Sequence, residues 1–366
     1  MSDLITPILM PKWGLSMAEG TLAAWHVEEG TQINPGDEIM DVETDKIANV
    51  VEAADGGLLR RRVGDAGEIY PVRALLGVLA PAEVSDAEVD AYIDAYVLPV
   101  VEEDEDTGPS YEFAELPIGK IRYAERPGEG TPVILIHGFG GDLDNWLFNI
   151  DALAEHAPVY ALDLPGHGQS VKSVDQPDLD KLVATIIDFM DHLKIDTAHL
   201  VGHSKGGLVS GQTAISHPGR VSSLTLICSA GLGTEINADY IDGFVSAASR
   251  KELKPKLHHL FADKSLVNRS MVDDLLKYKR IDGVQAYLEA LKAALFDNGQ
   301  QAVGVANGLE SMDLPILVIW GAEDAVIPVA HAQAISGADV VVIDDAGHMV
   351  QMENANRVNE LIKARL

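Results

Sequence analysis

Cysteine and basic residues are scarce in this sequence. Cys228 is the single cysteine among 366 residues, so an intramolecular disulfide is excluded and a reducing compartment is indicated. Only 27 lysines and arginines stand against 57 aspartates and glutamates, which gives a net charge of −30. Because such a chain repels phosphates, nucleic acid is not an expected partner.

Long hydrophobic runs and targeting signals are missing as well. No apolar run reaches the roughly 18 residues of a membrane-spanning helix. The first residues, MSDLITPILMPKWG, lack the basic and apolar regions of a signal peptide. We therefore expect a cytoplasmic protein that does not bind a membrane. A hydrophobic content of 47% is enough for a substantial core, and the length suits two or three domains.

The first 80 residues contain an internal repeat with an offset of 36. The recurring positions are apolar residues and prolines: Val27, Ile33, Pro35, Ile39, Met40 and Val42 return as Val63, Ile69, Pro71, Leu75, Leu76 and Val78. Short β-type runs and turn glycines separate them. This pattern predicts a small all-β sandwich of two similar halves, with a chance repeat as the alternative.

Residues 81–116 differ in charge from both neighbouring segments, because they include 12 acidic residues and no basic ones. Ser85 and Glu88 have the spacing of a capping box, so a short helix is expected up to Tyr96. The acidic run VVEEDEDTGPS repels itself and has little to bury. We therefore predict an acidic linker over residues 81–116, with a solvated domain edge as the alternative.

From residue 117 onwards, apolar strands alternate with helical segments. The candidate strands are nearly continuous apolar runs at residues 132–137, 158–164, 198–204, 222–228, 315–321 and 339–344. Runs of this kind are typical of strands buried on both faces, as in a mostly parallel sheet between helices. Residues 117–366 are therefore predicted to form a single α/β domain.

The residues Gly202-His203-Ser204-Lys205-Gly206 have the spacing G-x-S-x-G, after a predicted strand and before a helical stretch. A serine on so sharp a turn exposes its hydroxyl, so Ser204 is the candidate nucleophile. It needs a base and an orienting acid. His348 follows the last candidate strand, and Asp324 lies in a loop between the two. The chain order serine, aspartate, histidine is that of α/β-hydrolases.

Each of these assignments has an alternative. The G-x-S-x-G segment occurs in inert turns, His348 alone fits a surface loop, and Asp324 alone fits a helix cap. Glu323 and Asp345 compete with Asp324 for the role of the acid. What favours the triad is the order of the three residues together.

The loop LIHGFGGD supplies the expected oxyanion hole. A backbone N–H of this loop, assigned to Phe139, would act together with the N–H of Lys205, the residue after the nucleophile. His167, in the turn-rich loop DLPGHGQS, is predicted to be structural. A metal is not expected at this site.

The motifs HGFGG, DLPGHG, GHSKGG, GAED and AGH closely resemble those of the α/β-hydrolase superfamily, over residues 130–366. The resemblance implies a helical cap at about residues 233–305. Lys205 departs from the apolar residue usual at its position, which would mark the approach of an acyl acceptor or carrier. The cap segment from Arg250 to Arg280 holds nine basic and four acidic residues.

This basic segment has two explanations. One is a solvated face of an amphipathic helix. The other is the mouth of a site for a polyanionic ligand such as coenzyme A, with Lys254, Lys256 and Arg269 as the candidate contacts.

Residues 4–80 resemble a lipoyl domain, above all at Glu43-Thr44-Asp45-Lys46-Ile47-Ala48. In that family the corresponding lysine carries lipoate in amide linkage, so Lys46 is the expected attachment residue. Biotin carriers share the fold but usually have methionines around the lysine, whereas the aspartate and isoleucine here favour lipoate. Ala66 and Val72 depart from the pattern, because they replace two glycines expected from the first half.

A lipoyl domain (1–80) fused to an α/β-hydrolase-fold domain resembles the dihydrolipoyllysine-residue acetyltransferase components of acetoin dehydrogenase complexes. The resemblance implies acetyl transfer from a dihydrolipoyl arm on Lys46 to coenzyme A. It implies as partners a thiamine-diphosphate-dependent acetoin dehydrogenase component, a dihydrolipoyl dehydrogenase and a lipoate ligase, with the chain as a homo-oligomer in the complex. The alternatives are a lipoyl-tethered thioesterase or esterase, and a carrier or scaffold with an inactive triad.

Overall fold

The computed structural model describes residues 4–12, 17, 19–44, 48–98 and 110–366. The chain divides into two compact units, Met1–Gly108 and Pro109–Leu366. Their boundary falls within the acidic stretch 81–116. None of the helices in the described ranges is long and apolar enough to cross a membrane.

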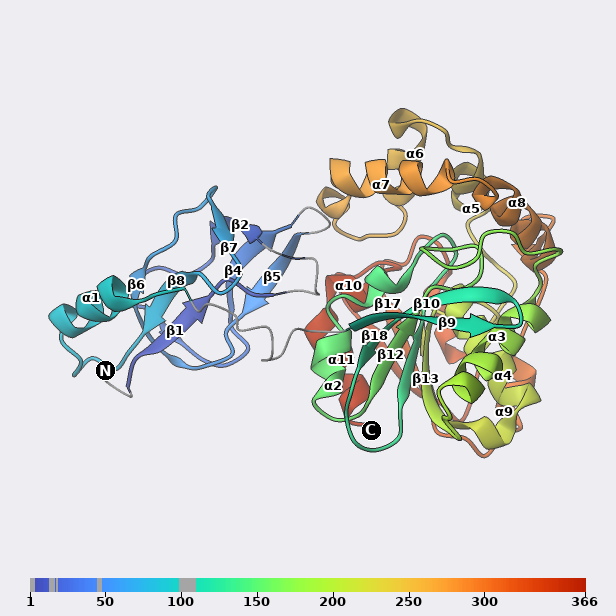
Figure 1. The fold of residues 1–366 in the computed structure, drawn as a ribbon, viewed down its shortest axis with the longest axis horizontal. Helices are drawn as coiled ribbons and strands as arrows, with labels where there is room; N and C mark the ends of the chain where they lie inside the picture. Colours follow the sequence, from blue (N-terminus) through green and yellow to red (C-terminus); the bar gives the residue numbers. More distant parts are fainter. Residues whose placement is uncertain (1–3, 13–16, 18, 45–47, 99–109) are drawn as a thin grey trace. The chain divides into compact units, whose positions relative to one another are not determined.

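The first unit is built from two four-stranded antiparallel sheets (Figure 1), with the strand orders β1-β8-β6-β3 and β5-β4-β2-β7. The strands of this unit are β1 (Thr6–Leu9), β2 (Glu19–Trp25), β3 (Gln32–Ile33), β4 (Glu38–Glu43), β5 (Ala48–Glu52), β6 (Gly57–Arg62), β7 (Ile69–Pro71) and β8 (Leu75–Leu79). If each strand is replaced by its equivalent in the other half of the repeat, the strand order of one sheet becomes that of the other. Strands β2, β3 and β4 then correspond to β6, β7 and β8, and β5 takes the edge place of β1. The predicted sandwich of two similar halves is confirmed.

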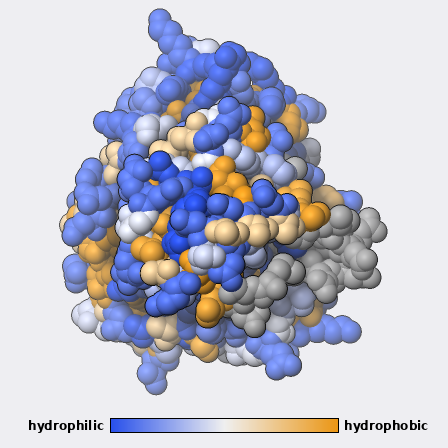
Figure 2. Space-filling view, turned by 90° about the vertical axis from the view of Figure 1, so that its left-hand side faces the viewer, coloured by the Kyte–Doolittle hydropathy of each residue, from blue (hydrophilic) through white to orange (hydrophobic). Residues whose placement is uncertain are grey.

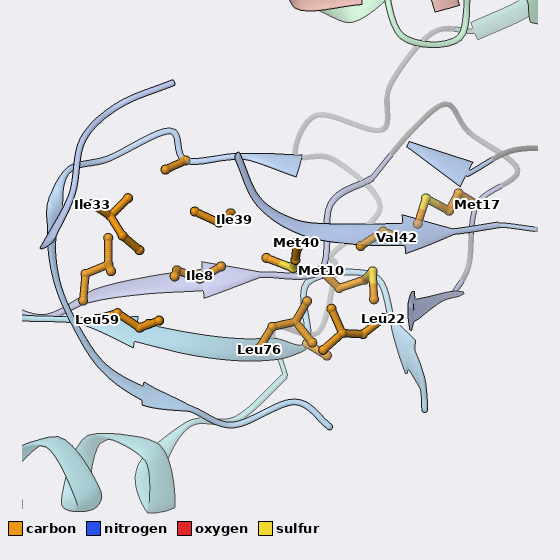
Figure 3. Close-up of a cluster of buried hydrophobic side chains, with 13 residues drawn as sticks. Ile8, Met10, Met17, Leu22, Ile33, Ile39, Met40, Val42, Leu59 and Leu76 are labelled. Atoms are coloured by element: carbon orange, nitrogen blue, oxygen red, sulfur yellow. The ribbon is translucent and has the colours of Figure 1, made fainter. Parts of the chain in front are cut away.

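Apolar side chains from both sheets form one core. Leu22, Met40, Val42, Leu59 and Leu76 are fully buried, and Figure 3 shows the side chains of this cluster lying between the strands of the two sheets. Three of the five, Met40, Val42 and Leu76, are repeated positions. A fourth, Leu22, pairs with Val42 across β2 and β4. The repeat in the sequence is therefore a repeat of core positions.

The turns of the two halves differ by one residue. Gly30 and Gly36 have positive φ values of 86° and 89°. In the second half the left-handed residues are Gly67 (φ 92°) and Arg73 (φ 67°), each one position after the alanine or valine that replaces the expected glycine. The second half thus retains both turns, but the residue with positive φ lies one position later in each. Arg73 adopts a conformation that is uncommon for a residue other than glycine.

Helix α1 (Asp86–Ala95) packs on this β unit. It begins after Ser85, and both hydrogen bonds of the capping box with Glu88 are present. Val89 is fully buried in a small cluster with residues of β8. Arg60 of β6 donates to Asp86 Oδ1 at 2.7 Å. The predicted helix is therefore present, and it is part of the first unit rather than a free linker segment.

The surface of the molecule is mixed in character. Figure 2 shows mainly hydrophilic residues on the face it draws, with hydrophobic residues dispersed among them. Among the described residues of the first unit, the exposed large hydrophobic ones are Leu4, Ile69, Val97 and Leu98. Ile69 is the repeat partner of the buried Ile33, so the symmetry of the core is broken at this position.

The second unit contains an eight-stranded sheet of order β18-β17-β14-β13-β11-β12-β10-β9. Its strands are β9 (Ser110–Leu116), β10 (Gly119–Arg126), β11 (Val133–Ile136), β12 (Val159–Leu162), β13 (Ala198–His203), β14 (Val221–Ile227), β17 (Ile316–Gly321) and β18 (Asp339–Ile343). In the part of the sheet with the order β18-β17-β14-β13-β11-β12, every neighbouring pair of strands is parallel. Strand β10 is antiparallel both to β12 and to the edge strand β9. All six candidate strands are confirmed, as is the mostly parallel sheet.

The sequence pattern predicts neither β9 nor β10, and β9 lies inside the range 81–116, for which it predicts a linker. Strand β9 is the edge strand of the sheet and is largely solvated, so its composition is polar. Phe113 in β9 is partly exposed and is covered by Lys120, whose Nζ lies 4.1 Å from the ring centroid. An edge strand of this kind has no continuous apolar run to reveal it.

Helices flank this sheet and cap one end of it. The flanking helices are α2 (Ile150–Ala154), α3 (Leu179–His192), α4 (Lys205–Ser216), α9 (Ala306–Glu310), α10 (Val350–Glu353) and α11 (Ala355–Lys363). The cap helices, between β14 and β17, are α5 (Ala238–Ser246), α6 (Arg250–Leu257), α7 (Arg269–Lys279) and α8 (Val284–Leu295). A short hairpin of β15 (Phe296–Asp297) and β16 (Gln300–Gln301) follows α8. Figure 1 shows α5 to α8 gathered at one end of the sheet.

Candidate active site

Ser204 lies on the sharp turn between β13 and α4. Its φ and ψ are 53° and −118°, a strained conformation that non-glycine residues rarely adopt. Its own N–H donates to Ile227 O at 2.9 Å, and its carbonyl accepts from Ala230 N at 3.0 Å. The turn is thus held by hydrogen bonds to the end of the neighbouring strand β14 and to the residues that follow it.

The glycines on either side of Ser204 are required by close backbone approach. A Cβ atom on Gly202 would lie 2.3 Å from Gly206 O, and one on Gly206 would lie 2.0 Å from Ile136 O. Real Cβ atoms do not come so close to backbone oxygens. The G-x-S-x-G spacing is therefore explained by the geometry of this turn.

His348 and Asp324 form a buried hydrogen-bonded pair. Asp324 Oδ2 lies 2.8 Å from His348 Nδ1, and both side chains are almost inaccessible to solvent. Asp324 Oδ1 accepts from the N–H groups of Val326 and Ile327, at 2.8 and 2.9 Å. With Nδ1 donating to the carboxylate, Nε2 is the ring nitrogen that is left to accept a proton.

The electrostatics of the pair suit an ionised carboxylate. Burial alone would raise the pKa of Asp324, but the neighbouring His348 and the hydrogen bonds to the carboxylate outweigh it and lower the pKa below its usual value. The competing acids are placed differently. Glu323 and Asp345 are exposed on the surface, and the carboxylate bonded to His348 is that of Asp324.

Two residues to which the sequence reasoning gave no role hold the backbone around His348. His203, before the serine, has its Nε2 2.9 Å from His348 O, and burial lowers the pKa of His203 to about 3. The neutral ring therefore donates from Nε2 to that carbonyl. Glu353 accepts from Gly347 N at 2.7 Å through Oε2. His203 was visible as part of the serine motif, whereas no local pattern marks Glu353.

The thiol of Cys228 lies beside this pair. Cys228, Asp324 and His348 have potential metal-ligand atoms within 4.8 Å of one another. Burial and the nearby Asp324 raise the pKa of Cys228 well above that of a free thiol, so it stays protonated. In the structure Asp324 and His348 form the hydrogen-bonded pair, and the Cys228 thiol is its neighbour.

The loop after β11 approaches the start of α4. Gly138 is so near that a Cβ atom there would lie 2.9 Å from His203 Nδ1 and 3.2 Å from Ser204 Cβ. Within the part of the chain that the structure describes, the N–H groups of Phe139 and Lys205 donate to no acceptor. They are the two predicted oxyanion-hole donors, and the described protein atoms do not occupy either N–H.

The coenzyme A candidates lie on two cap helices. Lys254 and Lys256 are on α6, and Arg269 is the first residue of α7. Lys256 Nζ pairs with Asp239 at 2.6 Å, and Arg269 Nε lies 3.8 Å from Asp273 Oδ2. Part of the positive charge counted in the sequence is therefore neutralised locally.

Lys46, the predicted lipoate attachment residue, lies outside the described residues. The strands on either side are described, and β4 pairs with β5 in antiparallel register, with Glu43 opposite Ala48.

Two family models match the chain: one described as alpha/beta hydrolase fold at residues 131–355, and one described as biotin-requiring enzyme at residues 6–70. Fold and site thus define a protein of the α/β-hydrolase fold that also carries a biotin/lipoyl-type domain. The acetyltransferase components of the acetoin cleaving systems of Cupriavidus necator and Pseudomonas putida are 53% and 49% identical to this chain, over 100% of it and 98% and 99% of the relatives. The chain belongs to this family of dihydrolipoyllysine-residue acetyltransferase components.

The second unit is also similar to hydrolases. A human monoacylglycerol lipase is 28% identical over 65% of this chain and 75% of the relative. A solved meta-cleavage product hydrolase from Pseudomonas fluorescens is 25% identical with a TM-score of 0.63, over 69% of this chain and 96% of that chain. The same fold therefore occurs with hydrolytic activities.

Proposed function

We propose that this protein transfers an acetyl group from a dihydrolipoyl arm on Lys46 to coenzyme A through an acyl-enzyme on Ser204. The observation that carries the proposal is the buried pair of His348 and Asp324, 2.8 Å apart, in the same domain as a serine on a strained turn. The chain's full-length relatives, named as acetyltransferase components of acetoin cleaving systems, support the choice of acyl group and carrier.

Lipoate bound to Lys46 would supply a thiol that holds the acetyl group as a thioester. In the transfer, His348 Nε2 accepts the proton of Ser204 as Oγ attacks the thioester carbonyl. The carbonyl oxygen becomes an oxyanion that accepts hydrogen bonds from the N–H groups of Phe139 and Lys205. The C–S bond then breaks, and His348 returns the proton to the departing sulfur.

The second half of the reaction uses the same groups in reverse. His348 takes the proton of the coenzyme A thiol, the sulfur attacks the acyl carbon, and the proton passes back to Ser204 Oγ as the ester bond breaks. Asp324 keeps the imidazole in the tautomer with Nδ1 protonated and stabilises its cationic form. Water must be kept away from the ester meanwhile, a task we assign to the cap formed by α5 to α8.

The other components of such a system follow from this chemistry. We assign the supply of acetyl groups to a thiamine-diphosphate-dependent acetoin dehydrogenase component and the reoxidation of the dithiol to a dihydrolipoyl dehydrogenase. A lipoate ligase would modify Lys46. On the cap, Lys254, Lys256 and Arg269 remain the proposed contacts for the phosphates of coenzyme A.

A lipoyl-tethered thioesterase is the second candidate, because the structural relatives of this domain are hydrolases. The test uses purified protein with S-acetyl-dihydrolipoamide as donor, with and without coenzyme A, and follows acetyl-coenzyme A and acetate together. Acetyl-coenzyme A that disappears in Ser204→Ala is the expected result. Acetate release that is indifferent to coenzyme A would overturn the transferase, and an unchanged Ser204→Ala would leave only a carrier or scaffold.

A further inference from the structure

Lys205, next to the nucleophile, has a buried side chain to which the mechanism above gives no role. It is among the largest fully buried side chains of the protein, at the first position of α4. Within the described residues no carboxylate lies within 4 Å of its Nζ, which instead lies 3.3 Å from His167 Nε2. Burying a lysine without a counterion costs free energy of folding, so a buried lysine at this position indicates a functional role.

His167 links Lys205 to the other half of the oxyanion hole. Its Nδ1 lies 2.8 Å from Pro165 O and must donate to it, so Nε2 has the lone pair. That lone pair accepts from Gly140 N–H at 3.3 Å as well as from Lys205 Nζ. Gly140 follows Phe139, the loop donor. One imidazole therefore joins the loop that carries Phe139 to the residue that supplies the second donor.

The histidines around the amine are neutral, and the titratable groups nearby include Lys172, whose Nζ donates to His167 O at 2.9 Å. Burial lowers the pKa values of His137 and His167 well below the usual histidine value, and the nearby Lys205 lowers them further. Asp163, the buried acid of the same loop, is engaged by two backbone N–H groups and by Arg122 at 3.7 Å.

The cap closes over this cluster with two tyrosines. Tyr278 of α7 stacks on the His167 ring, and the ring of Tyr287 of α8 meets it edge-on at 5.6 Å between centroids. The Tyr287 hydroxyl is buried and has no hydrogen-bond partner in the described part of the chain. The cluster thus contains one buried hydroxyl, that of Tyr287, which no described residue satisfies.

We propose that Lys205 is a positioning residue of the oxyanion hole, whose side chain ties the Phe139 loop to α4 through His167 and whose ammonium stabilises the oxyanion. This rests on the proposed function. Because burial without a counterion lowers the pKa of Lys205, the amine releases its proton readily in the resting protein. A negative charge that develops nearby in a region of low dielectric favours the protonated form again. The amine therefore holds its proton most firmly when the carbonyl oxygen becomes an oxyanion.

The first test compares Lys205→Met with Lys279→Met. Methionine keeps the backbone N–H of residue 205 and a similar volume. We expect a fall in kcat of about tenfold to a hundredfold with little change in KM, and no loss of thermal stability. Lys279 is also buried, but its Nζ is held by backbone carbonyls at the end of α5, including Val245 O at 3.1 Å. Its replacement should lower the melting temperature and leave kcat nearly unchanged.

The pH profile separates a cationic role from a merely structural one. Burial lowers the pKa of Lys205 well below the usual lysine value. Because the protonated amine is the active form, wild-type kcat should decline as the pH rises through this lowered pKa. Lys205→Met should lack that decline. An unchanged kcat in Lys205→Met, or a reduced kcat with the same alkaline decline as the wild type, would overturn the proposal.

Variants of His167 test the connection. His167→Leu should reproduce the loss of Lys205→Met, and the double variant should be no worse than either single one, because the two residues act as a unit. His167→Gln retains an acceptor and should recover part of the rate. If the fold-loss in kcat of the double variant equals the product of the two single losses, Lys205 and His167 act independently and the proposed connection is refuted.

A further assay distinguishes failure of the proposed function from failure of the inference about Lys205. It measures acylation by p-nitrophenyl acetate as the initial burst of p-nitrophenol release. If Ser204→Ala still shows the burst, the proposed function fails whatever Lys205→Met does. If Ser204→Ala abolishes the burst and Lys205→Met leaves its rate unchanged, the inference about Lys205 alone fails.

Discussion

Replacing Asp324 by asparagine tests the choice of the orienting acid. The substitution keeps the volume, and the side-chain oxygen can still accept from the N–H groups of Val326 and Ile327. The amide nitrogen then faces His348 Nδ1, where the wild type has a carboxylate oxygen at 2.8 Å. Two donors would oppose each other, so His348 would move its proton to Nε2 and could no longer accept one from Ser204.

The magnitude follows from the loss of the correct tautomer. In triads of this type the change reduces kcat by about 10⁴-fold. At 1.36 kcal/mol for each factor of ten, the transition state loses about 5.4 kcal/mol. Formation of acetyl-coenzyme A from S-acetyl-dihydrolipoamide is the assay, and Glu323→Gln and Asp345→Asn are the matched controls. Both controls should keep most of the activity, because these two side chains are exposed.

The reasoning would be refuted by an Asp324→Asn variant whose kcat stays within tenfold of the wild type. A large loss in Glu323→Gln or Asp345→Asn would likewise transfer the role of the acid to that residue. Circular dichroism of each variant should confirm that the fold is retained.

Three further predictions concern the backbone, the carrier lysine and the first unit. Gly206→Ala should lower the melting temperature of the second unit and abolish activity, because the added Cβ would lie 2.0 Å from a backbone oxygen. Gly219→Ala is the control: no atom lies within 4 Å of a Cβ there, so the free energy of unfolding should change by less than about 0.5 kcal/mol. Lys46→Ala should remove the mass of the lipoyl group in intact-mass spectra and leave transfer from free S-acetyl-dihydrolipoamide intact. A lipoyl group that persists would place the attachment elsewhere. Leu22→Ala should destabilise the first unit by about 2 to 5 kcal/mol in denaturant unfolding, since the leucine is fully buried, and a smaller effect would mean that this core is loosely packed.

Much of the fold could be predicted because burial leaves a direct trace in the sequence. The five strands β11, β12, β13, β14 and β17 of the second unit are covered on both faces, and so they read as continuous apolar runs. The sixth predicted strand, β18, is an edge strand with an apolar run that is only partly buried. The repeat of the first unit was visible because equivalent strands place apolar residues at equivalent core positions. The solvated edge strand β9 leaves no such trace, which is why it was assigned to a linker.

By itself, the sequence determined the two-domain organisation, the sharp turn at Ser204 and the order of the serine, the acid and the histidine along the chain. Those features depend on local spacing and on periodicity. Only the tertiary structure decided that Asp324 rather than Glu323 faces His348. It also decided that His203 holds a backbone carbonyl 145 positions away, and that Lys205 meets His167 across 38 positions. Such contacts follow from the order in which the strands lie side by side, and residue spacing along the chain does not encode that order.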